Sequence, residues 1–177
     1  MNILKTLWTW LEAIVRFFLL KVFRLKLSED QIQAFLQFIK FGIVGLTNTI
    51  VSYIIYLVCL KAFQHFEWLP NTDYLVAQVI AFFLSVLWSY YWNNRFVFTK
   101  KEGQTRSIWK TLLKTYISYA FTGLFLNTVL SILWVHVFGI PKEIAPIINL
   151  LVSVPINFFM NKLWAFKTDK NNADANS

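Results

Sequence analysis

The 177-residue sequence has a single cysteine, five glycines, four prolines and only nine acidic residues. The one cysteine, Cys59, excludes a disulfide within the chain and a metal cluster built on cysteines. Few glycines and prolines beside 19% aromatic residues exclude a collagen-like or disordered chain. Charged residues make up 15% and hydrophobic residues 57%, whereas soluble domains contain about a quarter charged residues. This balance indicates a membrane protein.

The charges that are present are mostly positive. Seventeen Lys and Arg residues against nine Asp and Glu residues give a formal net charge of +8. Nucleic-acid-binding proteins are also basic, but they seldom have so little polar surface. A basic and strongly apolar chain is typical of contact with anionic phospholipid.

Four runs without Asp, Glu, Lys or Arg are long enough to cross a bilayer, at about 41–60, 74–92, 115–138 and 144–161. Twenty helical residues extend about 30 Å, which is the thickness of the hydrocarbon core. Strands of a membrane barrel would instead be segments of about ten alternating residues. The sequence therefore predicts an all-α fold, a polytopic membrane protein with four transmembrane helices.

The positions of Lys and Arg predict the orientation of these spans. Fifteen of the seventeen lie before the first span, between the second and third spans, or after the fourth. The other two connections contain one each, Lys61 and Lys142. Because positive charge concentrates on the cytoplasmic side, we expect both termini to be cytoplasmic.

The spans divide the chain into three regions. Residues 1–37 are expected to be a cytoplasmic segment with an amphipathic helix lying on the membrane surface. Glu12 and Arg16 interrupt the apolar core that a secretory signal needs, although a fifth span is an alternative. Residues 38–168 are expected to be the transmembrane domain, and the polar residues 169–177 a disordered cytoplasmic tail.

Two pairs of similar segments indicate that a helical hairpin is duplicated. Residues 48–52 and 127–131 both read N-T-x-x-S in the first and third spans. Residues 93–98 and 161–166, at the ends of the second and fourth spans, both begin with Asn and end with Phe. Since each unit has two spans, the sequence predicts two parallel hairpin repeats.

The spans contain no acidic or basic residue that could carry a proton or sense voltage, which argues against a proton-coupled transporter. A small four-span drug exporter is disfavoured because it would need a carboxylate within the membrane. The sequence shows no zinc motif, nucleotide-sugar domain or catalytic constellation. We therefore expect a protein that is not an enzyme, with no catalytic residues, metal or cofactor.

The polar residues within the spans are amides and hydroxyls. Asn149, Ser153 and Asn157 are spaced by four and share one helix face. Such residues commonly form interhelical hydrogen bonds, worth about 0.6 kcal/mol each in membranes. Alternatively, the asparagines near the cytoplasmic side form a polar site together with the cations at the span ends, Lys40, Arg95, Lys114 and Lys162. Those cations can anchor the helices or hold a phosphate at headgroup depth.

Aromatic residues flank the same cations, at Trp92, Phe96 and Trp164. Aromatic side chains at this depth usually form an interfacial belt. Their flat faces are also suited to stacking on sugar rings. Both interpretations stay open at this point.

Several of these segments resemble the GtrA-like family. They are residues 38–45 (FIKFGIVG) followed by Asn48-Thr49, residues 93–98, and residues 157–166 (NFFMNKLWAF). The resemblance covers about 38–168. It implies a four-span protein of the bacterial cytoplasmic membrane that moves a polyprenyl-phosphate-linked sugar, glucose or another hexose, to the outer leaflet. That lipid would serve O-antigen or teichoic acid glycosylation.

The resemblance also implies a site and partners. The candidate residues for binding the lipid phosphate and sugar are Lys40, Asn48, Asn93, Arg95, Asn127, Asn157, Asn161 and Lys162. The family commonly has a cation where this sequence has Asn94. Expected partners are anionic phospholipid, the glycosyltransferases that make and use the lipid-linked sugar, and further copies of the chain in a homo-oligomer. The alternative function is a non-transporting subunit that recruits or stabilises a glycosyltransferase.

Overall fold

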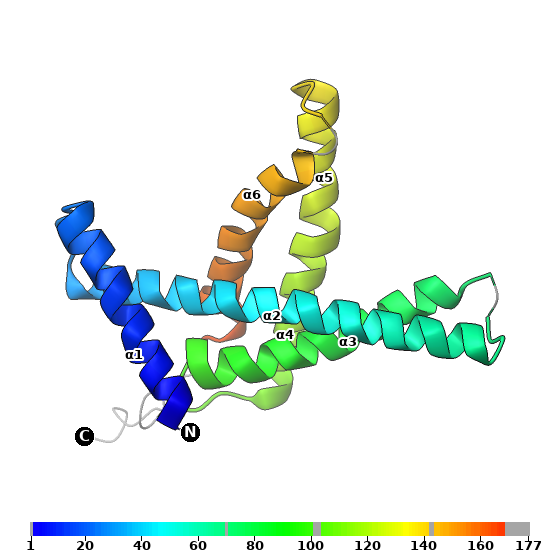
Figure 1. Ribbon diagram of the computed structural model, residues 1–177, viewed down its shortest axis with the longest axis horizontal. Helices are drawn as coiled ribbons and strands as arrows, with labels where there is room; N and C mark the ends of the chain where they lie inside the picture. Colours follow the sequence, from blue (N-terminus) through cyan, green and yellow to red (C-terminus); the bar gives the residue numbers. More distant parts are fainter. Residues whose placement is uncertain (1, 70, 101–103, 142–143, 169–177) are drawn as a thin grey trace, which may run out of the picture. The chain divides into compact units, whose positions relative to one another are not determined.

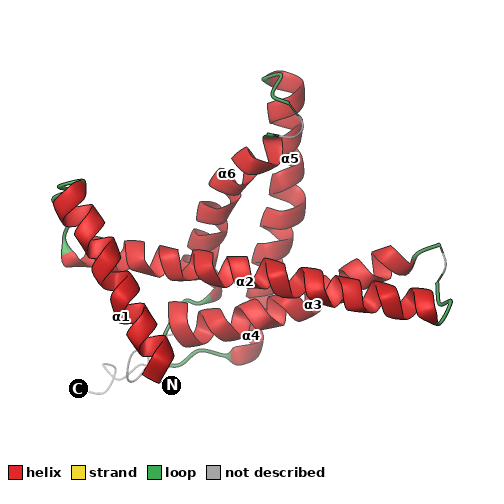
Figure 2. Ribbon diagram, in the orientation of Figure 1, coloured by secondary structure: helices red, strands yellow, loops and turns green. Residues whose placement is uncertain are grey.

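The computed structural model describes residues 2–69, 71–100, 104–141 and 144–168, and their regular elements are all helices (Figures 1 and 2). This confirms the predicted all-α fold class. The chain divides into two compact units, Met1–Lys40 and Phe41–Ser177. The tail predicted to be disordered, 169–177, lies outside the described residues.

The first unit contains α1 (Asn2–Phe17), the π-helical segment η1 (Phe18–Val22) and the beginning of α2 (Glu29–His65). Arg16 links the two α-helices, because its guanidinium donates to Glu12 at 3.1 Å and to Glu29 at 2.8 Å. A capping box starts α2: the Gln31 amide N–H donates to Ser28 Oγ, and the Gln31 side chain accepts from the Ser28 N–H. That α1 lies on a membrane surface stays a prediction.

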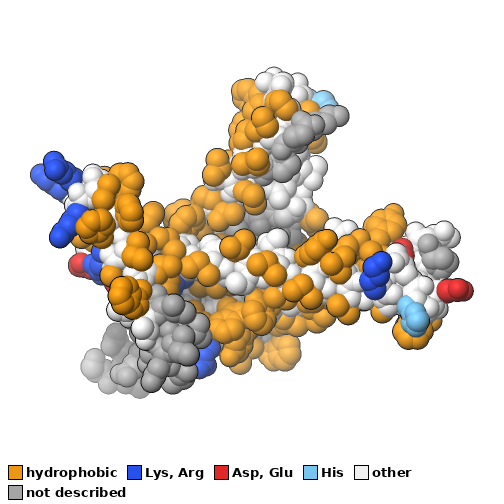
Figure 3. Space-filling view, in the orientation of Figure 1, with side chains coloured by type: hydrophobic (Ala, Val, Ile, Leu, Met, Phe, Trp, Pro, Cys, Tyr) orange, Lys and Arg blue, Asp and Glu red, His pale blue; other side chains and the backbone are white. Residues whose placement is uncertain are grey.

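Among the residues that the structure describes, four helices are long and apolar enough to cross a membrane: Glu29–His65, Asp73–Val97, Ile108–Val137 and Ile147–Ala165. They coincide with the four predicted spans but have different ends. The first begins twelve residues earlier than predicted, because the helix starts at its capping box and not where the charges stop. Figure 3 shows hydrophobic side chains spread along the lengths of the helices, as expected of surfaces that face lipid.

The second unit contains the remainder of α2 and all later elements. α3 (Asp73–Trp92) ends in the π-helical segment η2 (Asn93–Val97). The third span consists of α4 (Ile108–Ala120), η3 (Phe121–Leu126), α5 (Asn127–Ile132) and η4 (Leu133–Val137). The fourth consists of α6 (Ala145–Met160) and η5 (Asn161–Ala165).

Small and hydroxyl-bearing residues form the buried faces of α3 and α4. On α3 they recur every four residues, at Ala77, Ala81, Ser85 and Ser89, all at most 3% exposed. The corresponding residues of α4 and η3 are Thr111, Thr115, Ser118 and Thr122. Side chains of this size let helix backbones approach closely where lipid provides no hydrophobic driving force. The Tyr116 hydroxyl also crosses between the two helices and donates to the Phe83 carbonyl at 2.6 Å.

Hydrogen bonds from an amide join the last two helices. Asn149 of α6 is buried, and its Nδ2 donates to Ser131 Oγ at 2.7 Å and to the Asn127 carbonyl at 3.2 Å, both on α5. The predicted role of intramembrane asparagine in interhelical bonding therefore holds for Asn149. The duplication of the hairpins stays a prediction.

Replacing a small buried residue of α3 by a large one should destabilise the protein. Ala77 is fully buried, so Ala77→Leu must displace its neighbours, at a cost of about 1–3 kcal/mol. Val79→Leu is the control, since Val79 is 54% exposed on the same helix. Thermal unfolding in detergent should show a lower melting temperature for Ala77→Leu alone. Equal melting temperatures would contradict the assigned buried face.

Candidate functional site

The end of α3 forms a wide turn around a buried asparagine, called here the Asn93 turn (93–98). Asn93 is completely buried, and its Nδ2 donates to Ser89 Oγ at 3.0 Å. The Phe98 N–H returns to the Asn93 carbonyl at 2.7 Å, which closes the π-helical segment. Ser89 in turn shares a short hydrogen bond with the Tyr119 hydroxyl of α4. A chain of polar groups thus runs from this turn to the third span.

The end of α6 repeats this local geometry in the Asn161 turn (161–166). Asn161 is completely buried, and its Nδ2 donates to the carbonyl and the Oδ1 of Asn157, at 2.8 and 2.9 Å. The Phe166 N–H bonds to the Asn161 carbonyl at 2.8 Å. In both turns the asparagine Oδ1 is buried without a hydrogen-bond partner. Unpaired buried acceptors are rare in stable cores, so they mark both turns as functional candidates.

Arg106 brings the two turns together. Its Nη1 donates to the Phe166 carbonyl at 2.8 Å and its Nη2 to the Phe98 carbonyl at 2.9 Å. The rings of these two phenylalanines stack at 4.7 Å, and Arg106 Cζ lies 4.9 Å from the Phe166 ring centroid. Burial lowers the pKa of Arg106, which nearby Tyr90 partly opposes. An arginine still keeps its charge, so one fixed cation lies between the turns.

Arg106 also contacts Asn94, the position at which the resemblance described above implies a cation. Its Nη2 forms a short hydrogen bond with Asn94 Oδ1. A lysine or arginine at position 94 would place a second cation against a half-buried guanidinium. An amide provides an acceptor instead.

Three further cations lie in or near the two turns. Together with Arg106 they form a region called here the basic end (Arg95, Arg106, Lys114 and Lys162). Lys114 Nζ donates to the Trp164 carbonyl at 3.3 Å, and Lys162 Nζ lies 5.4 Å from the Phe158 ring centroid. Arg95 is exposed. Within the described part of the chain, both salt bridges involve Arg16. The cations of the basic end thus have no carboxylate partner there, an arrangement suited to an anion.

The remaining predicted site residues lie in different places. Asn157 belongs to the Asn161 turn through the contacts given above. Asn127 lies in the third span, where its Nδ2 faces the Gly123 carbonyl at 3.4 Å and its own carbonyl accepts from Asn149. Lys40 belongs to the first unit, with its Nζ 4.1 Å from the Trp8 ring centroid. The structure therefore groups Asn93, Asn157 and Asn161 with the basic end, and places Asn127 elsewhere in the second unit.

The predicted aromatic residues contact one another or a cation. Trp92 stacks on Phe96, with ring centroids 5.0 Å apart, in the Asn93 turn. Lys114 Nζ lies 5.5 Å from the Trp164 ring centroid. Stacking of these rings on a sugar stays a prediction.

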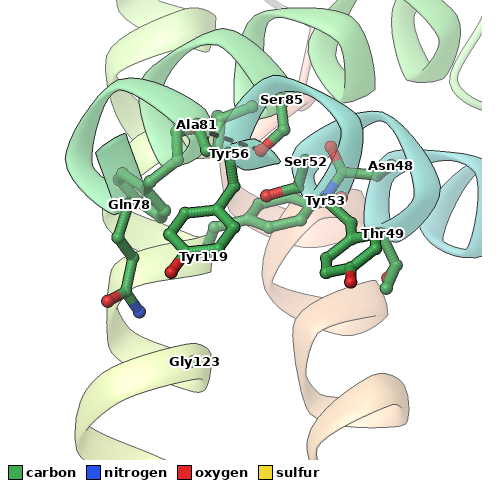
Figure 4. A pocket seen from close by; sticks show the side chains of 12 residues that line it. Asn48, Thr49, Ser52, Tyr53, Tyr56, Gln78, Ala81, Ser85, Tyr119 and Gly123 are labelled. Atoms are coloured by element: carbon green, nitrogen blue, oxygen red, sulfur yellow. Dashed lines mark hydrogen bonds between the residues drawn. The ribbon is translucent and has the colours of Figure 1, made fainter. Parts of the chain in front are cut away.

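A pocket of about 560 Å³ lies between α2, α3 and the third span (Figure 4). We call it the mid-span pocket, because its residues occupy the central turns of these helices. It is lined by Asn48, Thr49, Ser52, Tyr53, Tyr56, Gln78, Ala81, Phe82, Ser85, Val86, Tyr119 and Gly123. Of the predicted site residues, Asn48 alone lines it, and its Oδ1 is buried without a hydrogen-bond partner.

Sequence reasoning missed Arg106 and the tyrosines of the mid-span pocket. In the sequence, Arg106 is one of six Lys and Arg residues between the second and third predicted spans, and nothing local distinguishes it from Lys110. Tyr53, Tyr56 and Tyr119 counted as apolar aromatics. Their hydroxyls were a usable signal, because a tyrosine within a membrane span usually needs a polar partner for its O–H.

Among the described residues, no group of three or more His, Cys, Asp or Glu side chains is placed to hold a metal ion.

Comparison with known proteins identifies the architecture. Residues 40–166 match the family described as GtrA/DPMS, transmembrane domain. The chain belongs to this family. The GtrA/DPMS match includes both asparagine turns, Arg106 and the mid-span pocket, and together with the four apolar helices it establishes a multi-pass membrane protein.

Two relatives match nearly along their whole length. The uncharacterized membrane protein YwcD of Bacillus subtilis is 30% identical over 128 residues, which cover 72% of this chain and 94% of YwcD. The cell wall teichoic acid glycosylation protein GtcA of Listeria monocytogenes is 24% identical over 144 residues, covering 80% of this chain and 90% of GtcA.

A third relative is a larger protein. The dolichol-phosphate mannosyltransferase of Pyrococcus furiosus is 28% identical over 154 residues, which cover 84% of this chain but 38% of that enzyme. No solved structure matches this GtrA/DPMS chain.

Removing the guanidinium of Arg106 should loosen the basic end. Arg106→Ala leaves two buried carbonyls without their donor and is expected to cost about 2 kcal/mol or more. Lys110→Ala is the control, since Lys110 is an exposed cation four residues away. Thermal unfolding in detergent should separate the two variants. A melting temperature of Arg106→Ala equal to that of the control would refute the assigned role.

Proposed function

We propose that this protein is a translocase that moves a polyprenyl-phosphate-linked monosaccharide, glucose or another hexose, from the inner to the outer leaflet of the cytoplasmic membrane. The lipid-linked sugar would serve glycosylation of a cell-surface polysaccharide such as teichoic acid or O-antigen. The protein itself would form and break no covalent bond. Its partners would be the membrane glycosyltransferases that make and consume this lipid.

The observation that carries this proposal is the basic end. Two buried asparagine turns meet there, with the guanidinium of Arg106 between them and Arg95, Lys114 and Lys162 around them. A sugar phosphodiester is a monoanion with many hydroxyls, and amides beside cations provide for both parts of it. The polyprenyl chain can remain in lipid, so only the head needs a polar path.

The relatives support the same chemistry. One relative is named a cell wall teichoic acid glycosylation protein and another a dolichol-phosphate mannosyltransferase, so one name contains a surface polymer and the other a polyprenyl phosphate. The family match covers the complete region that forms the basic end. No ATP-binding motif occurs in the sequence, so the gradient of the lipid would drive net movement.

Much of the surface of the spans faces outward, because at most 28% of the apolar 18-residue stretch of each span is buried inside the protein. A polar path along helices this exposed needs a second wall to exclude lipid. We therefore propose that the protein acts as a homo-oligomer and that anionic phospholipid surrounds its basic end.

The translocation proposal is tested in liposomes that contain the purified protein and a labelled polyprenyl-phosphate hexose. The protein should accelerate the access of an impermeant reagent to inner-leaflet lipid. Arg95→Gln and Lys162→Gln together should slow this about tenfold or more, because a charged hydrogen bond to the phosphate is lost. Lys110→Gln controls for a general loss of positive charge. Absence of any acceleration would favour the non-transporting subunit that stabilises a glycosyltransferase.

The proposed orientation is tested with single cysteines in a Cys59→Ser background. Asn71→Cys lies in the connection between α2 and α3, and Thr99→Cys follows the Asn93 turn; both positions are exposed. We expect an impermeant maleimide to label Asn71→Cys in intact cells, and Thr99→Cys only after permeabilisation. The opposite labelling would invert the topology and place the basic end outside.

A further inference from the structure

The mid-span pocket is a separate site from the basic end. Its residue Ser85 precedes Asn93 by eight residues on the same helix, a separation of about 12 Å. One sugar ring cannot occupy both places at once. The two are nevertheless continuous, because Tyr119 lines the pocket and is hydrogen-bonded to Ser89, which accepts from Asn93.

The chemistry of the pocket differs from that of the basic end. Eight of its twelve lining residues carry a hydroxyl or a carboxamide, and none of the twelve carries a charge. Hydroxyls and carboxamides both donate and accept hydrogen bonds, as the hydroxyls of a sugar require. A site built for the phosphate would instead be expected to contain Lys or Arg.

One hydrogen-bond acceptor among the residues that line the pocket is unpaired. Asn48 Oδ1 is buried and has no hydrogen-bond partner, although Asn48 stands beside Ser52 on the pocket side of α2 (Figure 4). An unpaired buried carbonyl is costly in the absence of a donor. A sugar hydroxyl would provide that donor.

The shape of the pocket also fits a ring with one apolar face. Tyr53, Tyr56 and Tyr119 contribute aromatic rings to its walls, and such rings can cover the C–H face of a sugar. Its volume of about 560 Å³ lies within the range of about 300–1,000 Å³ of small-molecule sites.

The pocket has a buried floor and an exposed rim. Ala81, Ser85 and Val86 are at most 3% exposed, whereas Tyr53 is 61% exposed and Gln78 is also exposed. A ring seated on the floor would thus leave its lipid phosphate at the rim and its polyprenyl chain in the bilayer. Because no cation lines the pocket, the phosphate would not be held tightly, and the head could leave again.

We propose that the mid-span pocket binds the uncharged sugar ring of a polyprenyl-phosphate-linked hexose at mid-membrane depth, after the basic end has captured its phosphate. This inference rests on the proposed function for the identity of the lipid. It assigns Asn48, Ser52, Tyr56 and Ser85 to recognition of the sugar, and the basic end to recognition of the phosphate.

The experiment compares polyprenyl-phosphate glucose with unglycosylated polyprenyl phosphate, using the full-length protein. Two readouts are taken: the rate of translocation in liposomes, and the rise in melting temperature that each lipid causes in detergent. Asn48→Ala and Tyr56→Phe should slow the glucosylated lipid about five- to tenfold, since each removes one hydrogen-bonding group. They should leave the unglycosylated lipid unaffected and abolish the extra thermal stabilisation by the glucosylated one.

Two further variants serve as controls. Thr128→Ala removes an intramembrane hydroxyl that is exposed and bonded to its own helix at Leu124, so both lipids should behave as with wild type. Lys162→Gln should reduce the translocation rate and the thermal stabilisation equally for both lipids. Tyr56→Phe loses a single oxygen, which keeps the test valid if Asn48→Ala does not fold.

The outcomes separate this inference from the proposed function. If the wild-type protein translocates the lipid and the pocket variants move both lipids at wild-type rates, the inference is overturned and the proposed function stands. No translocation, but sugar-dependent stabilisation that Asn48→Ala removes, would overturn the function and support the pocket. Neither translocation nor sugar-dependent stabilisation would overturn both.

Discussion

The hydrogen bonds of Arg106 hold the ends of the second and fourth spans against each other. Phe98 and Phe166 each end a π-helical segment, and the Arg106 guanidinium donates hydrogen bonds to the carbonyls of both. π-Helical turns leave backbone groups that an α-helix would pair within itself, and they frequently occur at functional sites. Because one planar fork satisfies both turns, the buried Asn93 and Asn161 are placed on the same side of the second unit.

A gradient of polar character follows from this arrangement. Cations and buried amides gather at the basic end, whereas the polar side chains that line the mid-span pocket are all amides and hydroxyls. Placing a charge at membrane depth costs several kcal/mol more than placing it at the interface. The proposed translocation of an anionic head would therefore be favoured by keeping the charges of the protein at the basic end and neutral groups at mid-span.

Much of this could be predicted from particular residues. The uncharged runs predict the four spans, and the paired motifs at 93–98 and 161–166 predict two similar helix ends, both of which have a buried asparagine. Helix ends were less predictable, because α2 begins at the Ser28–Gln31 capping box, outside the apolar run. The sequence does not show whether an intramembrane amide joins helices or binds a ligand. Asn149 joins α6 to α5 through the Asn127 carbonyl and Ser131.

The sequence alone determines that the chain has four runs long and apolar enough to cross a membrane, because a bilayer accepts only long uncharged helices whose backbone groups are paired internally. It also determines the excess of positive charge beside the span ends. Only the tertiary structure decides which polar residues meet. Arg106 and Tyr119 find their partners across helices, at Phe166 and Ser89, and contacts between residues so distant in sequence leave no local pattern to recognise.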